Sequence, residues 1–404
     1  MIKPFVINSN ICIKHEDISS YANFFDAVAG NTGNSYITYS LLKETVDSAE
    51  SFSSLPQIPS LYTYDWQNAD KDISIINDRC SHVFLVLQDQ LRIAESYGLQ
   101  LPYDNIINFL KKVKRPILVA GLGANALNGY ETRFHERLSW KLVAFIKDLS
   151  WLVKNIGVRG YFTQEVLSAL GVNNTIVIGC PSFYENGEKR LIKKKGYSRI
   201  ACSTIRNKRI LSDATRIYLQ DEERLIKTVA FYQSECLGIQ ESLGWIKKKY
   251  RVFSNIDEWK KDIATNDFFV GTRVHGAILA INSGVPAVCM NKDSRAREMC
   301  EYLDIPYFPH FNSKNKRIED IYDACDYDEM NKNYAKKYEV YKQFLSDFGI
   351  RLLNNMDASV KMPSLSLYGV VPKLFRPWRM IGGGLRKVAH VVDKVGNYFQ
   401  DCDF

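Results

Sequence analysis

Arg273 and His275 stand two residues apart in the segment DFFVGTRVHGAILAINSGVPAVCM, residues 267–290, whose pattern predicts strand, turn, helix, turn and strand. We expect Thr272 to be the N-cap, with Arg273 and His275 in the first helical turn. The first turn of a helix presents unbonded N–H groups and the positive end of the dipole, which attract anions. Arg273 adds a bidentate donor for carboxylate or phosphate, and His275 can exchange a proton near neutral pH. The pattern favours an anion-binding site; the alternative is a core histidine beside an arginine that pairs with a carboxylate.

Other polar residues and glycines follow predicted strands or open predicted helices. Gly121-Leu122-Gly123-Ala124-Asn125 comes directly after an apolar strand, either as a ligand-facing turn or as a tight turn that needs glycine. The residue three after Gly123 is Ala126, so the dinucleotide fingerprint is incomplete and no dinucleotide cofactor is expected. Further candidate contacts are Asn31, Asn34, Asn125, His135 and Glu298, and for His135 and Glu298 the alternative is a solvated position on a helix.

Composition limits the class of protein. The 404 residues are 46% hydrophobic and 24% charged, with a formal net charge of +8, which predicts a folded chain of about two domains. The nine cysteines are scattered without a CxxC pair, so we expect reduced thiols, no structural zinc and a cytoplasmic protein. The first residues lack the apolar run of a signal peptide, and no window is apolar enough for a transmembrane helix.

Short apolar runs alternate with helix-period segments, which predicts an α/β fold with parallel sheets. The pattern restarts after a polar stretch at Tyr184–Tyr197. We therefore expect two Rossmann-like domains facing across a cleft, at residues 1–187 and 188–355, followed by a C-terminal amphipathic helical extension at 356–404. Ligands of such sheets bind at the carboxyl ends of the strands.

The expected elements are these. Strands are predicted at Phe5–Asn8, His82–Leu87, Ile117–Gly121, Thr175–Gly179, Arg199–Thr204, Arg251–Ser254, Asp267–Gly271 and Ala287–Met290. Helices are predicted at Ile37–Ser48, Asn105–Lys112, Thr132–Lys154, Thr163–Leu170, Glu222–Glu235, Gln240–Lys248, Asp257–Ala264, Arg273–Ser283, Ser294–Leu303 and Glu329–Phe348.

The positive charge is concentrated in two zones. Lys189–Arg209 contains nine Lys or Arg and no acidic residue, which we interpret as a solvated linker whose last members meet phosphates. No aromatic platform accompanies it, so no nucleic acid is expected. The second zone is the tail, where Lys373–Lys394 carries six positive residues and one negative one beside apolar positions of helical spacing. The tail fits an anionic membrane surface, and packing back onto the domains remains the alternative.

Three separated motifs resemble the polysaccharide pyruvyl transferase family in their order along the chain. They comprise Gly271–Gly276 with Gly284–Val288 and Asp293–Arg295; Gly157–Gly160 with Leu170–Val172 and Ile178–Ser182; and the glycine-rich turn Gly30–Ser35. Two positions depart from the family. Gly160 replaces the usual acidic residue after Arg159, and Leu87–Gln90 replaces a glycine-rich turn.

The resemblance implies a fold like that of GT-B-type glycosyltransferases and transfer of the three-carbon unit of phosphoenolpyruvate onto two sugar hydroxyls. The donor-binding Arg-x-His segment of the family corresponds to Arg273 and His275. For the implied chemistry, His275 is our candidate general acid, and Arg273 and Arg159 are our candidates for holding the carboxylate and phosphate of the donor. The rest of the donor site would be Thr272, Val274 and Gly276. The acceptor side would include Asn31, Asn34, Gly123, Asn125, His135 and Glu298.

The implied partners are phosphoenolpyruvate as co-substrate, with no other cofactor and no metal, and a lipid-linked oligosaccharide or polysaccharide acceptor. We therefore expect a cytoplasmic protein, peripheral on the inner face of the cytoplasmic membrane. Two alternatives remain open. One is a GT-B-type glycosyltransferase that uses a nucleotide sugar, and the other is a non-catalytic glycan- or lipid-binding protein of the same fold.

Overall fold

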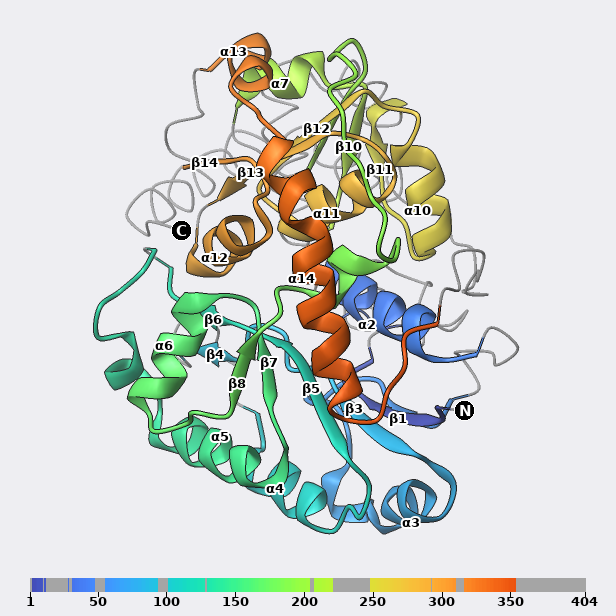
Figure 1. Ribbon diagram of the computed structural model, residues 1–404, viewed down its shortest axis with the longest axis vertical. Helices are drawn as coiled ribbons and strands as arrows, with labels where there is room; N and C mark the ends of the chain where they lie inside the picture. The colour runs from blue at the N-terminus through green and yellow to red at the C-terminus, as the bar shows by residue number, and fades with distance from the viewer. Residues whose placement is uncertain are drawn as a thin grey trace, which may run out of the picture.

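Two parallel β-sheets organise the chain (Figure 1). The computed structural model describes residues 2–9, 11, 28, 31–47, 55–93, 101–127, 129–203, 207–220, 248–291, 293–309 and 316–353. Within these ranges each sheet has six strands, ordered β2-β1-β3-β5-β7-β8 and β11-β10-β9-β12-β13-β14, and a two-stranded sheet pairs β4 with β6. The expected α/β fold of two Rossmann-like, GT-B-like domains is confirmed.

The first sheet belongs to the N-terminal domain. Its strands are β1 (Pro4–Ile7), β2 (Gln57–Ile58), β3 (His82–Leu85), β5 (Ile117–Leu122), β7 (Ile156–Val158) and β8 (Thr175–Val177), with β4 (Leu91–Arg92) and β6 (Ala124–Asn125) beside it. Its helical elements are α2 (Thr32–Thr45), η3 (Trp66–Asn68), α3 (Asp70–Arg79), α4 (Tyr103–Lys111), η5 (Phe134–Arg137), α5 (Trp140–Leu152), α6 (Tyr161–Ala169) and η6 (Pro181–Tyr184).

The second sheet belongs to the C-terminal domain. Its strands are β9 (Ile200–Ser203), β10 (Arg216–Tyr218), β11 (Tyr250–Arg251), β12 (Phe268–Gly271), β13 (Ala287–Asn291) and β14 (Tyr307–Pro309). The helices are α7 (Lys208–Asp213), α10 (Ile256–Ile263), α11 (Val274–Asn282), α12 (Ser294–Leu303), α13 (Ile318–Asp323) and α14 (Asp328–Ser346). Strands such as β5 and β12 are buried along their whole length, as expected for parallel sheets covered by helices on both faces.

Most predicted elements lie within a few residues of the observed ones, and Ser294–Leu303 matches α12 to the residue. The single helix predicted at Thr132–Lys154 is wrong. The segment forms η5 and then α5, because the Ser139 side chain accepts a hydrogen bond from Leu142 N and starts a new helix. The helices predicted at 222–235 and 240–248 (but for Lys248) and the C-terminal extension lie outside the described residues.

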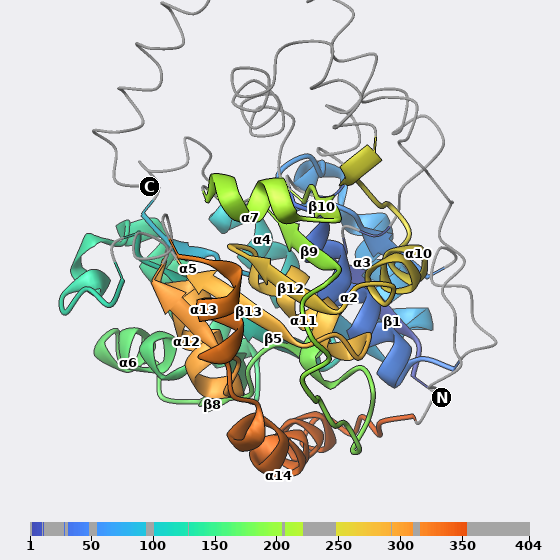
Figure 2. The same ribbon diagram turned by 90° about the horizontal axis from the view of Figure 1, so that it is seen from above.

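Helix α14 connects the two domains. Its first half contacts the C-terminal domain, where Asn333 Nδ2 donates to Asp304 Oδ2 at 2.9 Å. Its second half reaches the N-terminal domain, where the hydroxyl of Tyr341 donates to Glu44 Oε2 at 2.8 Å. Phe344 packs directly over Gly157 of β7. The helix runs from one sheet to the other in Figure 1 and lies at the edge of the molecule in Figure 2. The predicted boundaries at 187 and 355 remain predictions.

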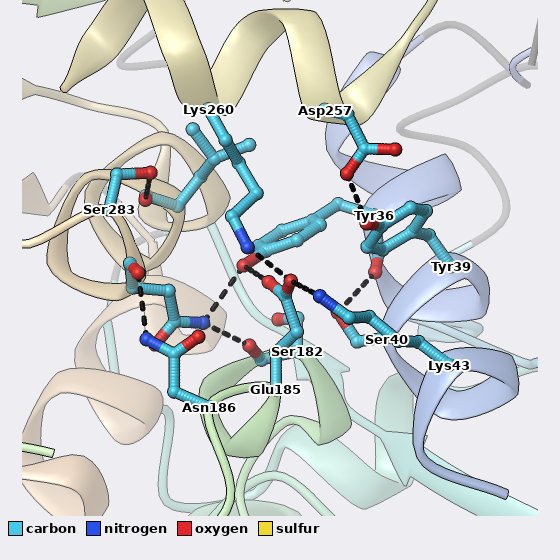
Figure 3. Close-up of polar contacts among 12 residues, drawn as sticks. Tyr36, Tyr39, Ser40, Lys43, Ser182, Glu185, Asn186, Asp257, Lys260 and Ser283 are labelled. Atoms are coloured by element: carbon cyan, nitrogen blue, oxygen red, sulfur yellow. Dashed lines mark hydrogen bonds and ion pairs between the residues drawn. The ribbon is translucent and has the colours of Figure 1, made fainter. Parts of the chain in front are cut away.

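A buried ionic cluster also joins the domains, centred on Glu185 (Figure 3). Lys43 of α2 lies 2.9 Å from Glu185 Oε1, and Lys260 of α10 contacts the same oxygen. The hydroxyl of Tyr36 donates to the other oxygen at 2.5 Å, and Asn282 of α11 donates to that hydroxyl at 2.8 Å. Burial alone raises the pKa of Glu185, but the two lysines outweigh it and hold the pKa below its usual value.

Replacing Glu185 by glutamine should lower the free energy of unfolding by about 3–5 kcal/mol, since two buried ammonium groups would lose their counter-charge. Chemical denaturation would measure the difference. Glu188→Gln, at an exposed position three residues away, is the matched control and should change stability by about 0.5 kcal/mol or less. Equal effects of the two substitutions would contradict a structural role for the cluster.

Most cations of the basic zone are exposed, as predicted, including Lys189, Lys193–Lys195 and Arg199. Arg190 is largely buried, and its guanidinium lies between the rings of Phe183 and Tyr334, 3.8 and 4.0 Å from their centroids. Arg199 pairs with Asp267 at 2.7 Å. Part of the predicted basic zone is therefore used in packing, because arginine can stack its flat cation on aromatic rings. Of the last members of that zone, Arg206 lies outside the described residues.

Candidate active site

Carboxyl ends of strands from both domains meet at one place. Arg159 follows β7, Cys180 follows β8, and Arg273 and His275 follow β12. Cys180 Sγ lies 3.6 Å from Nε2 of His275, so the two strand edges are in direct contact there. The structure thus brings together the residues that the sequence singled out on separate domains.

His275 is buried in the first turn of α11. The N-terminus of α2 packs against it so closely that a Cβ on Gly33 would lie 2.8 Å from the Cβ of His275. Burial is the main cause that holds the pKa of His275 well below its usual value, and the charges of Arg159 and Arg295 add to it. The imidazole is therefore neutral at neutral pH in the protein without ligand.

Arg273 is the N-cap residue of α11, with extended backbone angles (φ −98°, ψ 107°). The prediction that Thr272 caps this helix and that Arg273 is helical is wrong. Strand β12 continues through Gly271, and the backbone N–H of Arg273 donates to Ser203 Oγ at 3.4 Å, so the helix begins one residue later, at Val274. Thr272, Val274 and Gly276 are nevertheless all buried around this turn.

Arg159 is only 1% exposed, and the neighbouring backbone holds its side chain in place. Its Nε donates to the carbonyl of Gly121 at 2.8 Å. A Cβ on Gly123 would lie 2.7 Å from Cδ of Arg159, so glycine there makes room for the side chain. Gly121 and Gly123 therefore fix Arg159 together, the first through its carbonyl and the second through the space it leaves.

Asp89 and Arg295 are site residues whose pairing was not predicted from the sequence. Arg295 Nη1 lies 2.7 Å from Asp89 Oδ2, across the two domains, and Asn125 Nδ2 donates to the same oxygen at 2.9 Å. Burial raises the pKa of Asp89, but Arg295, Arg92 and Arg159 outweigh it and hold the pKa well below its usual range. The signal was present in the sequence, since both residues lie in segments directly after strands.

The electrostatics of this region favour an anion. The guanidinium groups of Arg159, Arg273 and Arg295 all act on the same imidazole of His275 and lower its pKa, and Asp89 opposes them only in part. Three guanidinium groups around one buried imidazole can accept a further counter-ion beside Asp89 and Asp293, which already pair with Arg295. A ligand with several negative charges would supply it.

Cys180 stands between the charged groups. Its Sγ lies 3.0 Å from Ser182 Oγ in addition to its contact with His275. Burial raises the pKa of this thiol, so it stays protonated at neutral pH and acts as a weak hydrogen-bond partner. The sequence identified Cys180 only as part of a motif.

Gln220 is a further residue that sequence reasoning missed. The residue is 1% exposed, and within the described part of the chain neither Oε1 nor Nε2 has a hydrogen-bond partner. Nε2 lies against α11, 2.5 Å from where a Cβ of Gly276 would be, and the Gln220 carbonyl accepts from Thr32 N at 3.1 Å. An unsatisfied buried amide is expensive, so a ligand that both donates and accepts would stabilise it.

The predicted acceptor residues are placed as follows. Asn31 caps α2, accepting from Gly33 N at 2.7 Å, and Asn34 lies in the first turn of that helix. Gly123 and Asn125 adjoin Arg159 and Asp89. His135 lies in η5, partly exposed, 3.9 Å from Glu136. No contact tests their roles in binding an acceptor, which remain predictions.

Glu298 of α12 caps a helix of the other domain. One carboxylate oxygen accepts from Thr163 N at 2.9 Å, in the first turn of α6, and Thr163 Oγ1 donates to the other at 2.7 Å. The N-cap of α6 is Gly160, which has no side chain to do this, and a Cβ there would lie 2.9 Å from Glu298 Oε2. Glu298 therefore occupies the space that a side chain at position 160 would need.

Burial is the largest influence on the Glu298 carboxyl and raises its pKa to about 7. Because the folded-state pKa exceeds the unfolded one, the folded protein binds more protons between about pH 4.5 and 7, and stability falls as pH rises through that window. Glu298→Gln should remove this decline, by up to about 3 kcal/mol. Denaturation of both proteins at several pH values would measure it, and parallel pH profiles would contradict the assignment.

Within the described ranges, no group of three or more His, Cys, Asp or Glu side chains is arranged to hold a metal ion. The helices in those ranges include none with the length and hydropathy needed to cross a bilayer.

Fold and site together define a two-domain α/β protein with a cationic site between facing strand ends. The sequence comparison narrows the class. A family model described as polysaccharide pyruvyl transferase matches residues 21–294, about two thirds of the chain. The chain belongs to this family, as the motifs predicted. Comparison with curated proteins finds no match.

Several solved structures share the general fold at low similarity. The UDP-GlcNAc 2-epimerase of Methanocaldococcus jannaschii has 9% identity and a TM-score of 0.41, covering 86% of this chain and 100% of its own. MnaA of S. aureus, solved with UDP, has 10% identity and a TM-score of 0.43, covering 86% and 97%. Anabaena Alr3699/HepE, solved with UDP-glucose, has 10% identity and a TM-score of 0.42, covering 86% and 96%. We draw nothing about ligands from similarities this low.

Proposed function

We propose that the protein transfers the three-carbon unit of phosphoenolpyruvate onto two hydroxyls of a sugar, as a cyclic ketal, and releases phosphate. The observation that carries the proposal is the meeting of Arg159 from one domain with Arg273 and His275 from the other. Phosphoenolpyruvate carries a carboxylate and a phosphate on one small carbon frame. Separate guanidinium groups around one imidazole match that distribution of charge.

Donor binding is the first step. Arg159 and Arg273 hold the two anionic groups. The N-terminus of α11 contributes its backbone N–H groups, and Thr272, Val274 and Gly276 lie around it. Arg295, which pairs with Asp89 and Asp293, is a third cation whose charge acts on His275. No metal or further cofactor takes part in this proposal.

Proton transfer follows from the same charges. The negative donor offsets the arginines that depress the His275 pKa, so the imidazole takes up a proton as the donor binds. The imidazolium then gives that proton to the methylene carbon, and C2 becomes electrophilic. One sugar hydroxyl attacks C2 and the second replaces phosphate. Of the two hydroxyl protons, one returns to His275 and the other leaves on the phosphate, which balances the reaction.

The acceptor lies beside this donor. Gln220 is suited to a sugar hydroxyl because its amide both donates and accepts, and its side chain is buried against α11. Asn31, Asn34, Asn125 and His135 are the other candidates. Glu298 serves as a cap in the ligand-free structure, so we assign it a supporting role. We propose that the acceptor is a lipid-linked oligosaccharide or polysaccharide precursor and that the enzyme works at the inner face of the cytoplasmic membrane.

Incubation with phosphoenolpyruvate and a panel of lipid-linked oligosaccharides tests the proposal. We expect release of phosphate and a product heavier by one pyruvate ketal, detected by mass spectrometry. Turnover of a nucleotide sugar, with no ketal formed from any acceptor, would instead support a glycosyltransferase. Ligand binding that persists without any turnover and is unaffected by His275→Ala would support a non-catalytic glycan-binding protein.

A further inference from the structure

Two tryptophans on α5 are largely exposed: 75% of Trp140 and 88% of Trp151 is accessible to solvent. They stand eleven residues apart in the helix, about three turns, so they lie on one face about 16 Å apart. Ala144 and Lys147 fall between them on the same face and are also exposed. The opposite face of α5 is buried in the N-terminal domain through Leu142, Phe145, Ile146 and Leu149.

This stripe has no function in the core or in the active site. Outward-facing positions of a domain-covering helix usually carry small or charged residues, and tryptophan is the largest apolar side chain. Tryptophan is also the residue most enriched where a membrane meets water, because its ring is apolar and its N–H is polar. A helix with one tryptophan near each end and cations between them suits a position parallel to a lipid surface.

The charge around the stripe is positive. Lys141 and Lys147 lie on α5 and Lys154 directly follows it, whereas Asp148 is the one acidic residue of the helix. Lys141 Nζ stands 5.6 Å from the ring centroid of Trp140.

The neighbouring helix adds more lysines at the same end. Asp148 pairs with Lys111 of α4 at 2.7 Å, which places the carboxyl end of α4 beside the second half of α5. Lys114, which follows, is exposed, and the exposed Lys112 pairs with Asp70 at 3.1 Å. Figure 1 shows α4 and α5 together along the outer lower edge of the N-terminal domain. The six lysines around the stripe outnumber the three aspartates that pair with them, Asp70, Asp148 and Asp347, so the surface keeps a net positive charge complementary to acidic headgroups.

We propose that this face of α5, formed by Trp140, Ala144, Lys147 and Trp151 with the lysines beside it, docks the protein onto an anionic lipid bilayer. The two rings enter the headgroup region, and the lysines contact acidic lipid phosphates. The inference stands independently of pyruvyl transfer, because lipid binding can be measured without substrate.

Co-sedimentation of the full-length protein with vesicles tests the proposal. We expect binding to vesicles of phosphatidylglycerol and phosphatidylcholine, weak binding to pure phosphatidylcholine, and a decrease with added salt. The double variant Trp140→Ser/Trp151→Ser should bind the anionic vesicles at least about tenfold more weakly. Tyr161→Ser, which removes a 62%-exposed aromatic from α6, is the matched control and should bind like the wild type.

Brominated lipids provide a second readout, since they quench tryptophan fluorescence only at close range. We expect quenching in the wild type and its loss in the double variant. Wild-type binding by the double variant, or equal binding to neutral vesicles, would overturn the proposal. The proposal would also be overturned if the wild type self-associated, the double variant did not, and both proteins bound lipid equally. Phosphoenolpyruvate binding should be measured on the double variant as well, because its result separates a failure of lipid docking from a failure of the proposed reaction.

Discussion

Replacing His275 by glutamine lowers the turnover number for ketal formation by about 10²–10⁴-fold, the usual contribution of a positioned acid–base group. Glutamine fills similar space beside Gly33 and Cys180 but cannot carry a proton to the methylene carbon. We therefore expect a folded variant that still binds phosphoenolpyruvate. Product formation by mass spectrometry and donor binding by calorimetry give the two quantities.

The protonation of His275 can be tested separately. Because burial and the nearby arginines hold its pKa well below the usual value, donor binding at neutral pH should take up a proton. Calorimetry in buffers of different ionisation enthalpy detects that uptake, and the glutamine variant should lack it. Equal proton uptake in both proteins would show that another group takes the proton. Unchanged turnover in the variant would remove His275 from the mechanism.

Replacing Arg159 by alanine weakens donor binding by about 30-fold to 1,000-fold, since a buried cation paired with the ligand would be lost. Lysine should rescue little of it. The ammonium group cannot both donate to the Gly121 carbonyl and present a planar fork to the ligand. The KM for phosphoenolpyruvate and direct binding of the donor would measure the change.

Gly123→Ala tests the same arginine without altering it. The new Cβ would lie 2.7 Å from Cδ of Arg159 and must displace it, so the KM should rise although every charged group remains. Gly171→Ala is the matched control, because its backbone has a positive φ of 83° but open space around it. We expect the control to lose about 1 kcal/mol of stability with an unchanged KM. A similar KM in the wild type, Gly123→Ala and Gly171→Ala would contradict the role of Arg159.

Local patterns in the sequence predicted much of the fold and part of the site. The alternation of apolar runs and helix-period segments predicted both sheets, because parallel strands buried on two faces are nearly uniformly apolar. Several short strands escaped detection, among them β7 and β10 with three residues each, although the equally short β8 was predicted. Helix α3 escaped because its sequence is polar, with only Ile73 and Ile76 buried.

The site residues also divide into those that local sequence patterns predicted and those that they did not. Arg273 and His275 could be found because they share one turn, and Arg159 because it lies in a recognisable motif. The contact of Cys180 with His275 spans 95 residues, and the cap that Glu298 provides for Thr163 spans 135. Such contacts depend on how the domains pack, which no local spacing encodes. Gln220 follows the undetected strand β10, so its position at a strand end could not be predicted either.

Helix α14 has a consequence for how the chain is made. Ribosomes release a protein from its N-terminus, and domains usually fold in that order as they emerge. Here the N-terminal sheet exposes Gly157 and the His82 side chain until Phe344 and the carbonyl of Phe348 arrive to cover them. The first domain therefore stays incomplete while nearly all of the second is synthesised. We therefore expect the N-terminal domain to complete its packing only after α14 has been synthesised.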